Sequence, residues 1–438
     1  MSDLKIFAVV GRPVLHSLSP PLFNIWFRAE RINAVYTRLA AASAEDAVRT
    51  ARAMKLAGFN VTSPFKEEIV SFLDGVDVHA ARIGAVNGVV VRNARWMGFN
   101  TDYLGVVRAL TRNGTDPRGK RAAVVGAGGA ARGAAYGLLR RRAQVTFLNR
   151  TEDRAREAAR SLGCAFAPIR RAKGVIRGSD ILISCVSSRT VPLERYHRDG
   201  QPYMRADYRS SRPNAGLKRP ADHSIDGLEW LIEQAIPAFR RFTGRPLPAR
   251  LARSARAANF AGRLAGRANI ALVGFTGSGK TATGRALARI LGWDLVDTDA
   301  EIEKASGMSI PEIFAMRGEP FFRNMEKSLI AECAPAAKNT IFALGGGAVL
   351  DRGTRGLLTR HCHVIWLWTS LESALARIDL QSRPVLAAAG GERAIEQVYR
   401  ARFRASARMA DLVLNTDGPL PVETAERIRY EVDQTFED

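Results

Sequence analysis

Cysteine is scarce in this sequence, and no cysteine pair has the spacing of a metal site. Four cysteines are scattered over 438 residues without a Cys-x-x-Cys pair, which indicates neither a disulfide framework nor a zinc site. Long apolar runs are also missing, since none approaches the roughly 18 residues that a membrane-spanning helix requires. The first residues lack the plan of a signal peptide. We therefore expect a cytoplasmic protein without a membrane partner.

Acidic residues are few relative to basic ones. The chain has 43 aspartates and glutamates against 65 lysines and arginines, a formal net charge of +22. Such an excess is typical either of a nucleic-acid-binding protein or of an arginine-rich surface around anionic ligands. The basic run from Arg240 to Arg267 contains no acid, but no recognition helix, zinc finger or aromatic platform accompanies it. We therefore expect no nucleic-acid partner.

A glycine-rich loop lies in the first half of the chain. Residues 124–135 read VVGAGGAARGAA, and the first three of them end the apolar stretch RAAVVG. The pattern G-x-G-x-x-G/A is typical of a dinucleotide site, where small residues let backbone amides approach a pyrophosphate. We predict that this loop binds a dinucleotide through Gly126, Gly128, Gly129 and Ala130.

The residues after the next apolar segment favour NADP over NAD. An NAD site usually has an acid there for the ribose 2′-hydroxyl, whereas this chain reads NRTEDR from Asn149. Arg150 and Arg154 can pair with a 2′-phosphate, and Asn149 and Thr151 can add hydrogen bonds. The alternative is an ordinary helix start with surface arginines. We predict NADP(H) as the cofactor.

Polar residues stand at the ends of the apolar segments in the first hundred residues. Hydroxyls, an amide, a lysine and a carboxylate occur there, at Ser17, Ser19, Thr62, Lys66, Asn87 and Asp102. These groups suit a polyhydroxylated acid and a proton transfer. Each could singly be a turn residue or a helix cap. Their combination favours a substrate site.

These segments together resemble shikimate dehydrogenase. HSLSP, NVTSPFK, IGAVN, NTD, GAGGAAR, NRT and GLEWLIEQA occur in the family's order between residue 6 and about residue 250. The resemblance implies NADPH-dependent reduction of the C5 ketone of 3-dehydroshikimate to shikimate. It makes Lys66 and Asp102 the catalytic pair, and it assigns the substrate hydroxyls and carboxylate to Ser17, Ser19, Thr62, Asn87 and Gln234.

Two stretches depart from that family's pattern. SCVS at 184–187 stands where NATS is usual, and DYRSSRPNAG from Asp207 replaces the usual D-x-x-Y-x-P-x-x-T. Both lie where the family places the nicotinamide. One alternative that stays open is therefore that this half is a degenerate binding or regulatory module. Another is that it acts on quinate or an aminoshikimate analogue, because small changes around Ser17, Thr62 and Gln234 would alter the substrate pocket.

A second nucleotide loop begins the last part of the chain. NIALVG leads into GFTGSGKT at 274–281, which fits G-x-x-x-x-G-K-[ST] between a strand and a helix. Backbone amides and the lysine hold phosphates in such a loop, and the threonine hydroxyl faces Mg²⁺. We predict ATP contacts at Gly277, Ser278, Gly279, Lys280, Thr281 and Thr283. The chain has neither the N-K-x-D motif of GTPases nor the L-S-G-G-Q motif of transporter ATPases.

Two aspartates follow this loop in the segment LVDTDAEIE. We expect this segment to be extended, with Asp297 and Asp299 on the same side of it. One carboxylate can support the metal while the other orients an attacking hydroxyl. The alternative is that Asp299 only caps the helix that follows.

The order of the later motifs resembles shikimate kinase. D-x-D, RGEPFFRNME, ALGGGAV, SRPVL and a late R…AD follow the loop from residue 269 to about 415. The resemblance implies that Asp297 and Thr281 hold Mg²⁺, and that Asp299 binds the shikimate 3-hydroxyl as the base, with Lys280 as a further catalytic group. It assigns Arg383 to a lid over ATP, and it assigns shikimate binding to Asp299, Arg323, Gly345, Gly346, Gly347 and Arg402.

The last of these motifs is altered in this chain. RFRAS has Ser406 at a position where the family has tyrosine, so Arg400, Arg402 and Arg404 compete for the carboxylate role. We select Arg402 because it stands eight residues before the Ala410-Asp411 pair, as in the family.

We predict an α/β protein that fuses two enzymes acting in succession. A shikimate dehydrogenase-like part is expected to have a three-layer α/β substrate domain and a Rossmann NADP domain. A parallel α/β P-loop domain, similar to nucleoside monophosphate kinases, is expected to follow it. The bounds are 1–262 for the first part (1–104 plus about 236–262 for substrate, 105–235 for NADP), 263–268 for the linker and 269–438 for the kinase. The small-molecule partners expected for the whole chain are 3-dehydroshikimate, shikimate and ATP. No obligate protein partner is implied.

Overall fold

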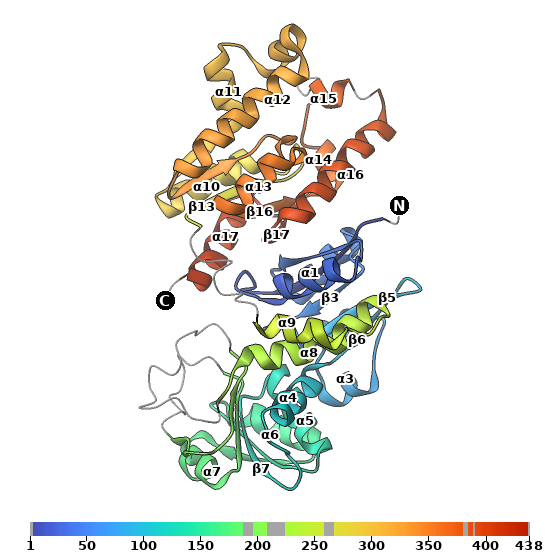
Figure 1. Cartoon of the computed structure of the whole chain (residues 1–438), viewed down its shortest axis with the longest axis vertical. Helices are drawn as coiled ribbons and strands as arrows, with labels where there is room; N and C mark the ends of the chain where they lie inside the picture. Colours follow the sequence, from blue (N-terminus) through green and yellow to red (C-terminus); the bar gives the residue numbers. More distant parts are fainter. Residues whose placement is uncertain are drawn as a thin grey trace. The chain divides into compact units, whose positions relative to one another are not determined.

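The computed structural model describes residues 3–186, 196–207, 224–257, 267–379, 384–388 and 390–436. These residues group into two compact units (Figure 1). The first unit comprises Met1–Pro20, Asn33–Leu56 and Ala261–Asp438, and the second comprises Pro21–Ile32 and Ala57–Phe260. Each unit combines separate stretches of the chain, so the predicted domain boundaries stay a prediction.

The first unit contains a parallel sheet in the order β14-β15-β13-β16-β17-β2-β1. Every neighbouring pair in this order is parallel. β16 is buried along its whole length, as expected for a strand inside a parallel sheet with both faces covered. The bounds are β1 Lys5–Gly11, β2 Ala34–Ala40, β13 Asn269–Val273, β14 Asp294–Asp297, β15 Thr340–Ala343, β16 Cys362–Trp368 and β17 Leu412–Asn415.

Helices alternate with these strands, which confirms the predicted parallel α/β architecture. α12 begins with a capping box between Ser309 and Glu312, and Gly318, with φ of 78°, interrupts it. α11, α12 and α15 lie together near the top of Figure 1. The helices are α2 Ala44–Ala53, α10 Lys280–Leu291, α11 Thr298–Ser306, α12 Ile310–Ala336, α13 Arg352–His361, α14 Leu371–Leu375, α15 Pro384–Ala387, α16 Glu392–Met409 and α17 Pro421–Phe436, with a short 3₁₀ turn η5 at Ala348–Leu350.

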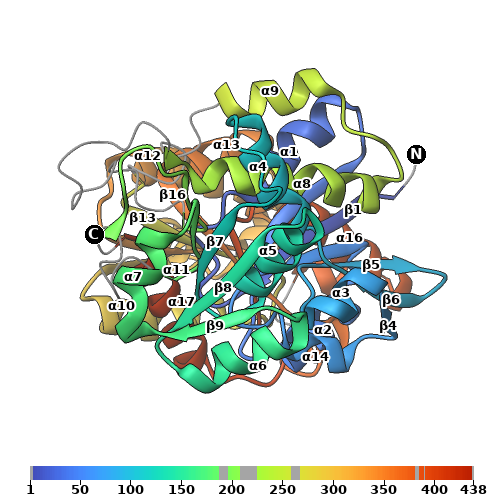
Figure 2. The ribbon, with the colours of Figure 1, turned by 90° about the horizontal axis from the view of Figure 1, so that it is seen from below.

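The second unit contains a parallel sheet in the order β12-β11-β10-β7-β8-β9. Figure 2 shows β7, β8 and β9 side by side. The chain proceeds from β7 toward β8 and β9, and β10 returns to the opposite side of β7. The carboxyl end of β7 is therefore a topological switch point, where ligands of such folds bind. The bounds are β7 Arg121–Val125, β8 Gln144–Asn149, β9 Ala165–Pro168, β10 Ile181–Ser184, β11 Tyr203–Arg205 and β12 Ser224–Ile225.

The same unit contains a mixed arrangement of strands in the order β3-β5-β6-β4. β5 runs antiparallel to both β3 and β6. The strands are β3 Gly58–Val61, β4 Gly75–Val76, β5 Gly88–Arg92 and β6 Arg95–Phe99. The helices of this part of the chain are α1 Ser19–Ala29, α3 Val78–Ile83, α4 Asp102–Arg112, α5 Gly129–Arg140, α6 Glu152–Leu162, α7 Ala172–Gly178, α8 Gly227–Thr243 and α9 Ala249–Ala257, with 3₁₀ turns η1 Glu68–Phe72 and η2 Ile169–Arg171.

α4 packs against both α5 and α8 and so carries residues of two motifs into one region. The indole Nε1 of Trp230 on α8 donates a hydrogen bond to the carbonyl oxygen of Asp102 at 3.0 Å. A cluster of buried apolar residues that includes Val106, Leu110 and Leu138 supports this packing. The first turn of α4 is therefore fixed by the core.

None of the helices in the described residues is long and apolar enough to cross a membrane.

Candidate active sites

The phosphate-binding loop of the first unit connects β13 to α10. Gly277 and Gly279 both have φ of 84°, a conformation that glycine adopts without strain. They bring the loop to the amino end of α10, where backbone N–H groups favour an anion. The hydroxyl oxygen of Ser278 is buried without a hydrogen-bond partner among the described residues, as expected of a group that a bound phosphate satisfies. The residues present therefore fit a nucleotide phosphate.

Lys280 and Thr281 begin α10 and face two different partners. The ammonium group of Lys280 donates to the carbonyl oxygens of Gly274 and Phe275, each at 3.1 Å. The hydroxyl of Thr281 donates to Oδ2 of Asp297 at 2.6 Å. This hydroxyl and carboxylate are hard oxygen ligands of the kind Mg²⁺ prefers. Thr283 is buried one turn further along α10.

The two aspartates of the D-x-D segment have different environments. Asp297 is the N-cap of α11, and its Oδ1 accepts hydrogen bonds from the backbone N–H groups of Asp299 and Ala300. Asp299 lies in the first turn and lines a pocket. The helix cap is thus made by Asp297 and not by Asp299, which leaves the side chain of Asp299 in the pocket.

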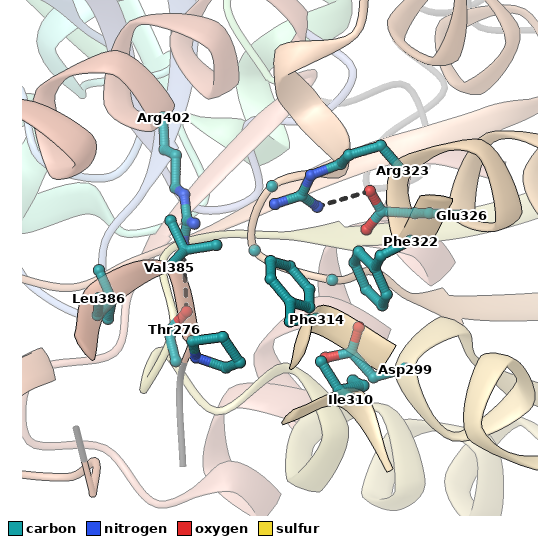
Figure 3. A pocket seen from close by; sticks show the side chains of 14 residues that line it. Thr276, Asp299, Ile310, Phe314, Phe322, Arg323, Glu326, Val385, Leu386 and Arg402 are labelled. Carbon is teal, nitrogen blue, oxygen red and sulfur yellow. Dashed lines mark hydrogen bonds and ion pairs between the residues drawn. The ribbon is translucent and has the colours of Figure 1, made fainter. Parts of the chain in front are cut away.

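That pocket brings together charged residues from α11, α12 and α16 (Figure 3). Arg323 on α12 donates to Oε2 of Glu326 at 2.8 Å, and Arg402 on α16 donates to the hydroxyl of Thr276 at 3.3 Å. Apolar side chains form other parts of the wall. The lining consists of Thr276, Asp299, Ile310, Phe314, Phe322, Arg323, Glu326, Gly345, Gly346, Gly347, Pro384, Val385, Leu386 and Arg402.

Charged side-chain groups lie directly against the backbone of the triple glycine. A β-carbon on Gly345 would stand 2.5 Å from Oε1 of Glu326 and 2.6 Å from Oδ1 of Asp299. A β-carbon on Gly346 would stand 2.8 Å from Nη1 of Arg402. Any larger residue would therefore displace the groups that line the pocket.

Burial alters the ionisation of two of these groups. Arg402 is 5% exposed, and burial, helped by the neighbouring Arg323, lowers its pKa to about 10, against the opposite effect of Glu326. It remains a cation at neutral pH. Burial raises the pKa of Glu326, which is 3% exposed, although Arg323 opposes this shift.

Two polar atoms of this pocket are unsatisfied. Nε of Arg402 and Oε1 of Glu326 are buried without a hydrogen-bond partner among the described residues. Buried polar atoms usually have partners, so a ligand is expected to complete these. Glu326 was missed by the sequence analysis, although its position three residues after Arg323 on one helix could have identified it.

The other arginines of the RFRAS region lie outside the pocket. Arg400 pairs with Glu396 and is 60% exposed, whereas Arg404 pairs with Asp3. The structure thus brings Arg402 to the predicted substrate pocket. Arg383, the predicted lid residue, lies outside the described residues.

The second unit brings together residues from four separate motifs. The ammonium nitrogen of Lys66 lies 2.6 Å from Oδ2 of Asp102, and both side chains are largely buried. The amide nitrogen of Asn87 lies 2.8 Å from Oδ1 of Asp102 and 3.1 Å from Oε1 of Gln234. Asp102 begins α4 and Gln234 belongs to α8. A lysine, a carboxylate and two amides thus form one hydrogen-bonded group.

Thr101 belongs to the same network, although the sequence analysis did not select it. Its hydroxyl lies 3.1 Å from Oε1 of Gln234 and 3.2 Å from Oδ1 of Asn87. Its place between two residues of the NTD motif was the available signal. Thr62 is half-buried at the end of β3. Ser17 and Ser19 belong to the first unit, where both are buried.

The glycine loop after β7 packs directly on this group. Gly126 has φ of 108°, and Gly128 is the N-cap of α5. A β-carbon on Gly129 would stand 2.8 Å from the β-carbon of Lys66. The loop therefore lies beside the catalytic lysine of the predicted site, and Ala130 follows in the first turn of α5.

The residues predicted to select NADP lie at the carboxyl end of β8. The side chain of Asn149 donates to the carbonyl oxygen of Thr151 at 2.9 Å. Arg150 is exposed, and Arg154 is within 3.5 Å of Glu67. Exposed cations at this position fit a 2′-phosphate. Of the two stretches that depart from the family, residues 187 and 208–216 lie outside the described part of the chain.

The folds and sites define a nucleotide-dependent oxidoreductase joined to a P-loop phosphotransferase. The model of the shikimate dehydrogenase substrate-binding domain matches residues 9–89, that of shikimate / quinate 5-dehydrogenase matches 109–207, and that of shikimate kinase matches 276–433. The chain belongs to the shikimate dehydrogenase family and carries a shikimate kinase domain behind it. This confirms the fusion predicted from the sequence.

The relatives of known identity agree with this assignment. An NADP⁺ shikimate dehydrogenase of Syntrophobacter fumaroxidans is 35% identical over 56% of this chain and 89% of its own. The structure of shikimate dehydrogenase from Aquifex aeolicus is 29% identical in sequence and has a TM-score of 0.54. The match covers 59% of this chain and 100% of that one. A Thermus thermophilus shikimate 5-dehydrogenase, solved with NADP(H) and shikimate, is 30% identical, with a TM-score of 0.51 over 58% of this chain and 99% of that one.

Proposed function

We propose that the chain is a bifunctional enzyme that makes shikimate and then phosphorylates it. The dehydrogenase half reduces 3-dehydroshikimate with NADPH, and the kinase half transfers a phosphoryl group from ATP to the 3-hydroxyl of shikimate. The observation that carries the proposal is that one chain holds both the Lys66–Asp102 pair beside a dinucleotide loop and the arginine-lined pocket beside a phosphate loop. No obligate protein partner is required by this proposal.

In the dehydrogenase half, the loop of Gly126, Gly128 and Gly129 would hold NADPH, which would supply a hydride to the ketone carbon. Charge then develops on the ketone oxygen, and the ammonium group of Lys66 stabilises it and donates a proton to it. Asp102, within 2.6 Å, keeps that ammonium group in place and is itself held by Asn87. Asn87 and Gln234 bind substrate oxygens, together with Thr62, Ser17 and Ser19.

In the kinase half, Asp299 accepts the proton of the attacking 3-hydroxyl. Lys280 and the loop amides hold the phosphates of ATP, with contacts from Gly277 to Thr281. Thr281 and Asp297 would hold Mg²⁺, which would neutralise phosphate charge, because both offer hard oxygen ligands and their side chains are adjacent. Arg383 is proposed to close over ATP, and closure of this kind excludes water.

Arg323 and Arg402 bind the carboxylate of shikimate. Their guanidinium groups enter one pocket from different helices, and a planar guanidinium suits a carboxylate. Glu326 holds Arg323 by a hydrogen bond and presents a second, unsatisfied oxygen that can accept from a substrate hydroxyl.

Replacing Arg402 with alanine is expected to weaken shikimate binding specifically. Loss of a charge-assisted hydrogen bond should raise the KM for shikimate roughly 10- to 100-fold, with a much smaller change in the KM for ATP. Steady-state kinase kinetics with each substrate varied in turn measure both constants. Arg400→Ala is the matched control, because Arg400 is exposed and pairs with Glu396. A larger effect on ATP than on shikimate would contradict the assignment.

A coupled assay with the purified full chain tests the whole proposal. 3-Dehydroshikimate, NADPH and ATP-Mg²⁺ are supplied together, and NADPH loss and ADP formation are followed in parallel. We expect NADPH loss with dehydroshikimate even when ATP is left out. ADP should form only once shikimate is present. ADP formation from added shikimate without any NADPH oxidation would show that the first half is a binding module. Parallel assays with quinate and NADP⁺ test the substrate alternative.

A further inference from the structure

Glu431 is a buried carboxylate that neither proposed reaction uses. It lies on α17, the last helix of the kinase half, and is 1% exposed. Its Oε2 accepts hydrogen bonds from the backbone N–H groups of Val14 at 2.7 Å and Leu15 at 2.9 Å. These residues stand 417 and 416 positions away in the sequence, within the same compact unit. A kinase-half side chain thus holds backbone of the dehydrogenase half.

The segment that Glu431 holds leads directly into the serines proposed to bind dehydroshikimate. The backbone N–H of Ser17 donates to the carbonyl oxygen of Val14 at 2.9 Å and closes a turn. The backbone N–H of Ser19 donates to the hydroxyl of Ser17 at 3.3 Å. The position of both serines therefore follows from the position of Val14 and Leu15.

A second contact from the kinase half reaches the same segment through Arg38 on β2. The guanidinium group of Arg38 donates to the carbonyl oxygen of Ser17 from Nε at 3.0 Å and from Nη2 at 2.6 Å. Its Nη1 donates to the carbonyl oxygen of Asp411 at 3.0 Å. Arg38 therefore bridges the serine segment to the residue that precedes β17.

The elements that carry these contacts are joined by strand pairing. β17 pairs in parallel with β2, with Val413 opposite Leu39 and Leu414 opposite Ala40. The side chain of Asn415 donates to the hydroxyl of Thr50 on α2 at 2.9 Å. The serine segment thus rests on β2, β17 and α17 as one packed structure.

Packing alone does not account for a carboxylate at position 431. Burial raises the pKa of Glu431, while the amides of Val14 and Leu15, together with Arg427 and Arg12, act in the opposite direction. An apolar side chain would fill such a place without desolvating a carboxylate. Two buried amides of the serine segment, however, need an acceptor.

We propose that the kinase half positions the substrate loop of the dehydrogenase half, with Glu431 as the positioning residue. Glu431 fixes the backbone of Val14 and Leu15, and Arg38 fixes Ser17 against Asp411. Dehydroshikimate binding in the first half thus depends on the last helix of the second half. The proposal rests on the proposed function of Ser17 and Ser19.

The test uses three variants of the full chain. Glu431→Ala removes the acceptor, Glu431→Gln keeps one carbonyl oxygen at the same place, and Glu426→Ala is the control on α17, where Glu426 is 51% exposed and pairs with Arg429. Both activities are measured for each variant, with KM and kcat for dehydroshikimate reduction and for shikimate phosphorylation. The kinase constants report whether the shared unit has folded.

Glu431→Ala is expected to raise the KM for dehydroshikimate about tenfold with little change in kcat, because groups that bind substrate and transition state alike act on KM. Glu431→Gln should restore most of that loss, and kinase constants and Glu426→Ala should match the unaltered protein. An unchanged KM in Glu431→Ala, equal defects in both Glu431 variants, or a parallel loss of kinase activity would each overturn the proposal. Failure of the unaltered chain to reduce dehydroshikimate would instead refute the proposed function.

Discussion

Lys66→Ala is expected to abolish most dehydrogenase turnover while leaving the kinase intact. Loss of a general acid should lower kcat for dehydroshikimate reduction roughly 100- to 10,000-fold. NADPH should still bind, since the glycine loop and the residues at the end of β8 are unchanged. NADPH oxidation gives the rate, and the quench or enhancement of NADPH fluorescence on binding gives the affinity. Phosphorylation of added shikimate should proceed at the normal rate.

The matched control for this change is Lys173→Ala. Lys173 is exposed on α7 of the same unit, so its loss removes an equal charge without touching Asp102. Reduction at a normal rate in Lys66→Ala would remove Lys66 from the mechanism. Asp102→Asn tests the partner: it keeps the shape but loses the charge within 2.6 Å of the ammonium group.

Asp299→Asn is expected to lower kinase turnover while leaving the dehydrogenase intact. The asparagine side chain fills the same space in the pocket but cannot accept the proton of the attacking hydroxyl. Kinase turnover should therefore fall roughly 100- to 10,000-fold, whereas dehydroshikimate reduction should be unchanged. ADP formation with saturating shikimate and ATP measures the first rate, and NADPH loss measures the second.

A nearby aspartate provides the control for Asp299. Asp294 is exposed at the start of β14, and Asp294→Asn should leave both activities intact. Equal rates for Asp299→Asn and the unaltered chain would exclude Asp299 as the base. In that case Glu326, whose Oε1 lies beside the same glycine, would be the next carboxylate to test.

The α/β architecture was predictable because apolar strands, glycine loops and helices follow one another in short local segments. The geometry of each glycine loop is determined by a few adjacent residues. Gly126 in one loop, and Gly277 and Gly279 in the other, have the positive φ that such turns need. The site residues were selected by motif, and the roles given to them stay predictions.

Contacts between distant parts of the chain could not be predicted in this way. Thr101 and Glu326 stand within the motifs NTD and RGEPFFRNME, but the hydrogen bond of Thr101 to Gln234 and the place of Glu326 in the pocket are visible only in the folded chain. Glu431 meets Val14 across 417 positions, and no local pattern encodes a contact over that separation. Nor does the sequence of β2 specify β17 as its neighbour, because each reads as an ordinary apolar strand.

The pairing of β17 with β2 also limits how the chain can be divided. β17 lies between β16 and β2, so both of its edges are hydrogen-bonded. A kinase half produced alone would leave one edge of β17 with open N–H and C=O groups, which template self-association. In the full chain β2 occupies this edge. A kinase half produced alone would therefore need a charged residue or a proline on β17 to prevent pairing with another chain.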